Sequence, residues 1–128
     1  LSPRTFEPRF EMPGGEIVPF DGLSAQARQL VCLATIPVHQ LWAANEFADP
    51  RTCEGVIAVD DAELNMATRV LAELPTSLRR ILPRAQWILA SASPDLAHAA
   101  QLGGTITLRR ELDSDRVLAY EGELALTH

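Results

Sequence analysis

Two adjacent aspartates, Asp60 and Asp61, are the residues best placed for chemistry, because they follow directly on the apolar run at residues 55–59. Carboxylates at the end of a strand can hold a divalent cation, directly or through water, and a free carboxylate can serve as a general base. Glu63 lies three residues after Asp60, which is also the spacing of a capping pair at the start of a helix. A metal position and a structural cap are therefore both open.

The cysteines and histidines do not form a ligand pattern. Cys32 and Cys53 are 21 positions apart with no CxxC spacing, so neither a zinc site nor a disulfide framework is indicated. Cys32 falls on an apolar helical stretch, where a small core residue is expected. His39 and His98 have no ligand partner four residues on, which favours partly exposed surface positions.

All 11 basic residues are arginine, and the chain contains no lysine. This excludes Schiff-base chemistry, a lysine general base and the phosphate-binding lysine of a P-loop. The formal charge of −6 also argues against a generic nucleic-acid surface, since such binding depends mainly on basic side chains.

The length of 128 residues fits one domain. Its apolar stretches reach only about ten residues, against the roughly twenty that span a bilayer. With no export leader visible, a soluble protein of the reducing cytoplasm is expected.

The first half of the chain is expected to contain little sheet. Residues 1–15 are rich in proline and glycine and predict an extended lead-in or an edge strand near residues 6–10, and residues 16–20 predict a short strand. Ser24 is a suitable N-cap for an amphipathic helix, which Pro37 should break or kink before it resumes to about Phe47. Trp42 and Trp87 are expected to be core or packing residues.

The middle of the chain alternates strands and helices, which predicts an α/β fold. Residues 55–59 and 86–90 are apolar without alternation, as in parallel strands covered on both faces. Between them a helix from Leu64 should end at Pro75, with a further short helix to Leu82. Another helix should begin at residues 93–94 and stop at Gly103.

The last segments, residues 105–109 and 117–126, alternate apolar and polar residues and flank a polar turn at 113–115. They predict an antiparallel, half-exposed pair of strands.

Three segments resemble the second half of an ABC-type ATPase domain of the RecF and SMC kind, which also occurs in AAA ATPases with ABC-like heads. Residues 19–30, which contain Leu-Ser-Ala-Gln at 23–26, are similar to the signature segment that opens a long helix. Residues 55–64 are similar to a Walker B strand that runs into its D-loop. Residues 87–96, with Ser-Ala-Ser-Pro at 91–94, are similar to the strand that ends in Thr-His-Ser-Pro. Their order and spacing extend the resemblance over about residues 16–126.

The resemblance assigns roles to single residues, and several depart from the family pattern. Asp60 takes the place of the carboxylate that holds Mg²⁺ through water. Asp61 replaces the catalytic glutamate and is one methylene shorter. Ala92 replaces the histidine that contacts the γ-phosphate, so that polar contact is lost.

The signature positions Ser24, Ala25 and Gln26 would face the phosphate of an ATP held by an opposite subunit. Gln26 replaces the glycine that lets the backbone approach this phosphate. Because of Gln26, a plain helix cap is the favoured explanation of Ser24 over a phosphate contact. The Walker A loop has no counterpart in the chain.

The missing Walker A strand lies, in the family, between the strands matched by residues 86–90 and 105–109. Its absence would strip hydrogen-bond partners from two strand edges, at about 1 to 3 kcal/mol for each buried unpaired group. We expect the chain either to pair these two strands directly or to borrow a strand from another polypeptide.

The resemblance implies a partial P-loop NTPase-like, three-layer α/β sandwich with mainly parallel central strands and an antiparallel C-terminal hairpin. A lead-in at residues 1–15 would precede one ABC-ATPase-like lobe at 16–128. The first functional hypothesis is a degenerate ATPase-head lobe, without cofactor and non-hydrolytic alone, that associates with a protein partner or a second copy and contributes to a Mg-ATP site in trans.

Two alternatives remain. One is a protein interaction module that kept the fold and lost nucleotide binding. The other is a small enzyme in which Asp60 and Asp61 bind a divalent metal directly.

Overall fold

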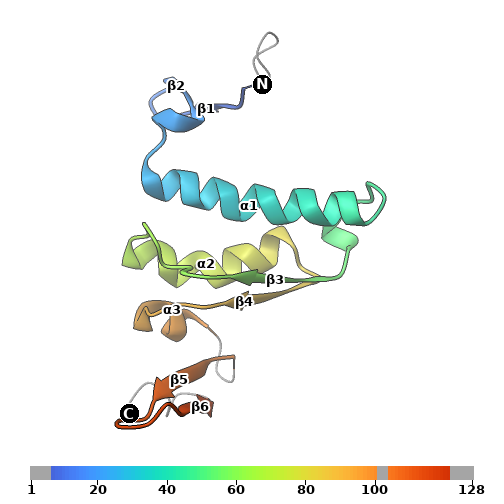
Figure 1. Ribbon diagram of the computed structural model, residues 1–128. Coiled ribbons are helices and arrows are strands. Elements are labelled where there is room, and N and C mark those ends of the chain that lie inside the picture. The colour runs from blue at the N-terminus through green and yellow to red at the C-terminus, as the bar shows by residue number, and fades with distance from the viewer. Residues whose placement is uncertain (1–6, 101–103, 122–128) are drawn as a thin grey trace.

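The computed structural model describes residues 7–100 and 104–121 (Figure 1). A central parallel strand pair and three α-helices lie between two small antiparallel hairpins. In chain order the elements are β1 (Arg9–Glu11), β2 (Ile17–Pro19), the 3₁₀ turn η1 (Phe20–Gly22), α1 (Ala25–Ala44), the 3₁₀ turn η2 (Pro50–Thr52), β3 (Gly55–Val59), α2 (Thr68–Ile81), β4 (Ala85–Leu89), α3 (Pro94–Ala99), β5 (Ile106–Arg110) and β6 (Val117–Glu121).

Strands β3 and β4 are parallel neighbours, in register from Gly55 beside Ala85 to Val59 beside Leu89. The prediction that the two apolar runs lie side by side, with their carboxyl ends together, is confirmed. Helix α2 makes the crossover between them, as parallel strands require.

The expectation that these strands are covered on both faces is wrong for the residues described. Burial alternates along β3 and β4, so only one face of the pair meets the core. Val59, Trp87 and Leu89 pack there against buried leucines of the helices. On the other face Val56 is 65% exposed and Ile88 is 51% exposed. Within residues 7–100 and 104–121 the structure thus has two layers, and the third layer of the expected sandwich is not confirmed.

Helix α1 runs without interruption through Pro37, which was expected to break or kink it. Packing holds the helix on both sides of the proline: Leu33 is buried in the core, and Leu41 lies against Gly55 of β3. A Cβ on Gly55 would stand 2.7 Å from Leu41 Cδ2, so glycine permits this close approach.

Helix α2 also continues through a proline, and the prediction that Pro75 ends it is wrong. A proline inside a helix costs about 3 kcal/mol. The buried leucines at 71, 74 and 78 lie on both sides of Pro75, which is itself buried. Because each buried leucine contributes about 1.5 to 3 kcal/mol, their burial outweighs that cost.

The core is a cluster that joins all three helices to the inner face of β3 and β4. Its buried members are Leu33, Ala62, Leu71, Leu74, Leu78 and Leu96. Within the described residues no helix is long and apolar enough to cross a membrane.

The two hairpins lie at opposite ends of the molecule in Figure 1. β1 pairs with β2 across the turn at Gly14 and Gly15, so the predicted lead-in and the start of the lobe share one hairpin. β5 pairs with β6 in the predicted antiparallel manner, and residues 122–126 of the predicted second strand lie outside the described residues. In the described part of the chain β5 does not pair with β4, so the expected direct closure of the sheet is wrong. A strand borrowed from another polypeptide stays a prediction.

Candidate functional site at the ends of the parallel strands

Asp60 and Asp61 lie in a bulge at the carboxyl end of β3. Ala90 donates its N–H to Val59 O at 2.8 Å and accepts the N–H of Ala62 at 3.0 Å, which leaves the two aspartates looped out between these bonds. Asp61 has a φ of 48°, an uncommon conformation for a residue with a side chain.

Both aspartates of the bulge lie at the surface. Asp60 Oδ1 accepts the N–H of Asp61 at 3.0 Å, and both residues are exposed. Ala62, the next residue, is fully buried. The core contact of Ala62 thus fixes the bulge and leaves both carboxylates in contact with solvent. The described residues contain no group of three or more His, Cys, Asp or Glu side chains that could hold a metal ion.

Glu63 joins the two strand ends. Its Oε1 accepts the N–H of Ala92 at 2.9 Å, across 29 positions of the chain. The Ser91 hydroxyl, followed by the backbone N–H groups of Glu63 and Ala92, lowers the pKa of Glu63 below its ordinary value, against a smaller effect of desolvation. The other oxygen, Oε2, is shielded from solvent and has no hydrogen bond of good geometry to the described residues. Glu63 is therefore ionised at neutral pH and fixes the strand ends to each other.

Of the two alternatives left open for Asp60 and Glu63, the helix cap is wrong. Residues 61–66 form successive turns, with bonds from Leu64 N to Asp61 O and from Met66 N to Glu63 O. Helix α2 begins only at Thr68, after Ala67 as N-cap. The carboxylate of Glu63 is used for a contact between distant segments instead of a local cap.

The segment after β4 is short and held by local bonds. Ser93 is the N-cap of α3, as predicted, but its side chain makes no capping bond; instead the Ser91 hydroxyl accepts the Ser93 N–H at 2.9 Å. Ala92 is exposed in the loop after β4 and has no polar side-chain atom. Its backbone N–H donates to Glu63. Helix α3 ends at Ala99, short of the predicted stop; Leu102 and Gly103 lie outside the described residues.

The signature-like segment opens α1. Ser24 Oγ accepts the N–H of Ala27 at 3.1 Å, which confirms Ser24 as the N-cap. Gln26 Oε1 accepts the N–H of Ala67 at 2.9 Å, immediately before α2. Gln26 therefore ties the start of α1 to the start of α2, a role that sequence reasoning missed because no local pattern signals a partner 41 residues away. Ala25 is exposed and contributes no polar side chain.

The structure thus brings most of the predicted site residues into one linked region. Hydrogen bonds join the segment after β3 to the segment after β4 through Glu63, and to the start of α1 through Gln26. A bond from Thr68 Oγ1 to Asp95 Oδ2, at 3.2 Å, adds the starts of α2 and α3. Neither Thr68 nor Asp95 was predicted as a site residue.

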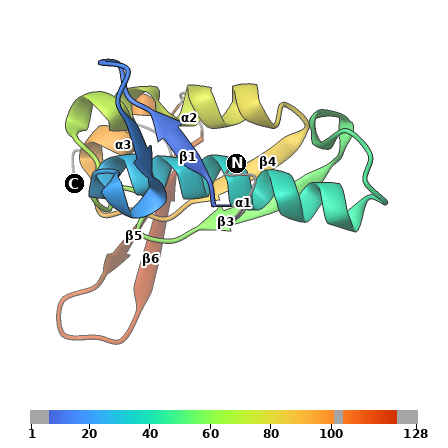
Figure 2. The same ribbon diagram turned by 90° about the horizontal axis from the view of Figure 1, so that it is seen from above.

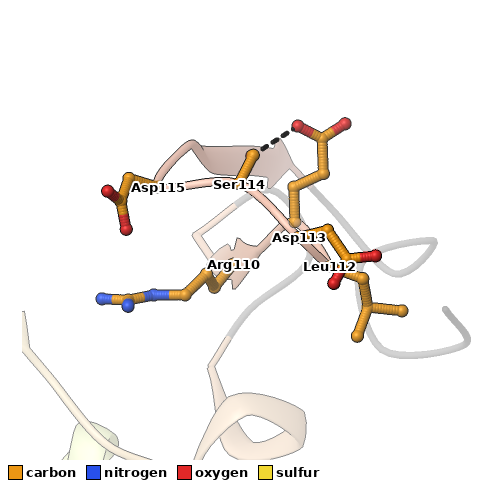
Figure 3. A pocket seen from close by; sticks show the side chains of 6 residues that line it. Arg110, Leu112, Asp113, Ser114 and Asp115 are labelled. Carbon is orange, nitrogen blue, oxygen red and sulfur yellow. Dashed lines mark hydrogen bonds between the residues drawn. The ribbon is translucent and has the colours of Figure 1, made fainter.

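Two shallow hollows lie elsewhere. One surrounds the β5–β6 turn, where Arg110 and residues 111–115 line it and the Ser114 hydroxyl bonds Glu111 (Figure 3). The other lies beside the end of α1, between Ala44 and Arg84, where Arg84 forms an ion pair with Glu54. Neither contains any of the predicted site residues.

The remaining candidates take surface or packing positions. His39 is exposed as predicted, and so is His98, whose ring nitrogen Nδ1 lies 2.7 Å from Pro94 O. Cys32 is a free, half-buried thiol. Trp42 and Trp87 were expected to be core or packing residues. Trp42 is a packing residue, 41% exposed, whose ring lies against that of Phe47 with centroids 4.6 Å apart and planes tilted by 60°. Trp87 packs against the core.

Comparison with known proteins gives a likeness of fold alone. No protein-family model matches the chain, and no curated protein matches its sequence. A solved structure from work on the ATP-driven dimerization and DNA-stimulated activation of SMC ATPases is similar, with a TM-score of 0.59 at 14% identity. The match covers 89% of this chain and 64% of that chain. The fold is therefore distantly similar to an SMC ATPase, and the chain spans less than two thirds of its length.

Proposed function

We propose that this chain is a degenerate ATPase-head lobe that acts by association with a second polypeptide and does not hydrolyse ATP alone. The observation that carries the proposal is the parallel pair β3–β4, whose carboxyl ends bring Asp60 and Asp61 to the same edge as Ala92. In open α/β sheets ligands bind outside the carboxyl ends of the strands. The likeness to an SMC ATPase fold supports the same position.

The chemistry of the site explains why the lobe needs a partner. The sequence contains no lysine and no P-loop, so the phosphate-binding lysine of such a loop has no counterpart. Ala92 offers a methyl group where the resemblance places a histidine. Asp60 is exposed beside the strand end and is the residue that would hold Mg²⁺ through water once a partner supplied the triphosphate.

The exposed face of the strand pair, with Val56 and Ile88, supports association as the practical role. A partner that supplies a strand and a covering layer would bury this face. This follows the expectation that a strand is borrowed from another polypeptide.

The experiment is a Mg-ATP titration followed by thermal shift, on the chain alone and with the product of a neighbouring gene that encodes a P-loop. We expect no shift for the chain alone and a stabilisation of the mixed sample, which Asp60→Asn abolishes. Asp49→Asn is the matched control, because Asp49 is an exposed aspartate far from the strand ends. A shift of the lone chain that survives Asp60→Asn would refute the proposal.

A second candidate is an interaction module that no longer binds nucleotides. The hydrogen bond between Gln26 Oε1 and the Ala67 N–H favours this candidate, because it gives the Gln26 side chain a structural partner within the chain itself. Complex formation with the same gene product, insensitive to Mg-ATP and to Asp60→Asn, would select this candidate.

A further inference from the structure

One face of the β5–β6 hairpin is apolar and exposed to solvent. Directly opposed residues of an antiparallel pair project on the same side. The register therefore gathers six residues on one face, which we call the hairpin face: Ile106, Leu108 and Arg110 of β5 with Glu121, Ala119 and Val117 of β6.

The apolar members of the hairpin face have no cover in the described structure. Ile106 is 63% exposed, Leu108 is 69% exposed and Val117 is 56% exposed. The opposite face is better covered, since Leu118 and Tyr120 are 40% and 38% exposed. The hairpin face is thus the side turned to solvent, on a hairpin that extends away from the helices in both views (Figures 1 and 2).

An uncovered two-stranded hairpin is only marginally stable in water. Contiguous exposed apolar residues with a polar rim are typical of interaction sites. The hairpin face therefore needs a second layer.

The two charged residues of this face indicate what that layer is. In the register Arg110 lies opposite Val117 at the turn end, and Glu121 lies opposite Ile106 at the other end. Arg110 and Glu121 belong to different strands, so they occupy opposite corners of the face, with the apolar residues between them.

We propose that the hairpin face packs against the same face of a second copy of this chain. In an isologous dimer the twofold axis lies in the plane between the two sheets. When this axis passes midway between the two charged corners, Arg110 of each copy lies against the partner subunit's Glu121. The apolar residues of the two copies then meet in the middle of the interface. The face is thus complementary to itself in both charge and polarity.

A strongly acidic or basic partner would leave one of the two corners facing a like charge. A second copy pairs both corners. The face spans only five residues of each strand, so the dimer is small and weak, in the class of interfaces that bury less than about 1,200 Å². This inference does not depend on nucleotide binding or on the proposed ATPase partner.

The first test is sedimentation velocity of the chain from about 10 µM to about 1 mM, the range in which a weak interface is half-occupied. We expect a concentration-dependent shift from monomer to dimer. Leu108→Ser should weaken the dimer by at least about tenfold. Ile36→Ser is the matched control, because Ile36 is 56% exposed on α1 and belongs to neither proposed surface, and it should leave the dimer unchanged.

The second test reverses the corner charges. Arg110→Glu and Glu121→Arg should each weaken the dimer, and the double variant should restore it, since the pairs re-form with opposite polarity. Circular dichroism verifies that each variant is folded. A monomer at every concentration, a dimer sensitive to Ile36→Ser and not to Leu108→Ser, or a double variant as weak as the single variants would each overturn the proposal.

Discussion

Replacing Glu63 tests the bond that joins the two strand ends. Its Oε1 accepts the Ala92 N–H at 2.9 Å, and the donors around it lower its pKa. Glu63→Ala removes the acceptor and its charge, while Glu63→Gln keeps a carbonyl oxygen and removes only the charge. Loss of stability should therefore be larger for alanine than for glutamine.

The magnitude follows from the type of bond. A hydrogen bond to a charged group contributes about 1.5 to 3 kcal/mol. Glu63 is only half-buried, so solvent screening reduces this to about 1 kcal/mol. With an unfolding entropy of about 2 cal/mol/K per residue, 1 kcal/mol lowers the Tm of a 128-residue chain by about 4 °C.

The pH dependence has a defined sign. The pKa of Glu63 is lower in the folded chain than the ordinary value of about 4.3 in the unfolded chain. Its contribution is therefore fully present above about pH 4.3, and it is lost as the pH falls through the folded value. The difference in Tm between the parent chain and Glu63→Ala should narrow in that acidic range.

The assay is thermal unfolding by circular dichroism at pH 7 and at steps down to about pH 3. Glu73→Ala is the matched control, since Glu73 is exposed on α2, and it should change the Tm by less than about 2 °C. Equal Tm values for Glu63→Ala and the parent chain at pH 7, or a gap that widens as the pH falls, would refute the reasoning.

Two further substitutions test the core and the link between the helices. Leu78→Ala, at 2% exposure, should lower the free energy of unfolding in urea by about 2 to 5 kcal/mol, whereas Val56→Ala, at 65% exposure, should change it by less than about 1 kcal/mol. A cost below 1 kcal/mol at Leu78 would show that the helices do not pack as described. Gln26→Ala should cost about 0.5 to 1.5 kcal/mol in the same assay, because it leaves the Ala67 N–H without its acceptor. Gln40→Ala, on the exposed side of α1, should be neutral, and equal effects at both glutamines would contradict the assigned role.

Local chemistry was sufficient to predict the helix starts at Ser24 and Ser93 and the position of both parallel strands. A cap is set by residues within one turn, and an apolar run of five or six residues has few other ways to be buried. The exposed hairpin at the end was predicted for the same reason, because alternation along a strand is a local property.

The prolines show where local reasoning fails. A proline inside a helix is unfavourable by itself, and the sequence does not show that buried leucines on both sides will hold the helix together. Local reasoning also fails at the outer face of β3. The apolar run predicted that this face is buried, but it is exposed in the described structure. Burial on that face needs a covering layer, which the described residues do not provide.

The sequence by itself determined the order of the elements, the absence of lysine chemistry and the position of Asp60 and Asp61 at a strand end. Only the tertiary structure decided that the two aspartates bulge outward, that Glu63 joins the strand ends and that Gln26 links two helices. Each of these depends on bonds between segments 28 to 41 residues apart. Such bonds form only when packing brings the two segments together, and no local sequence pattern predicts that packing.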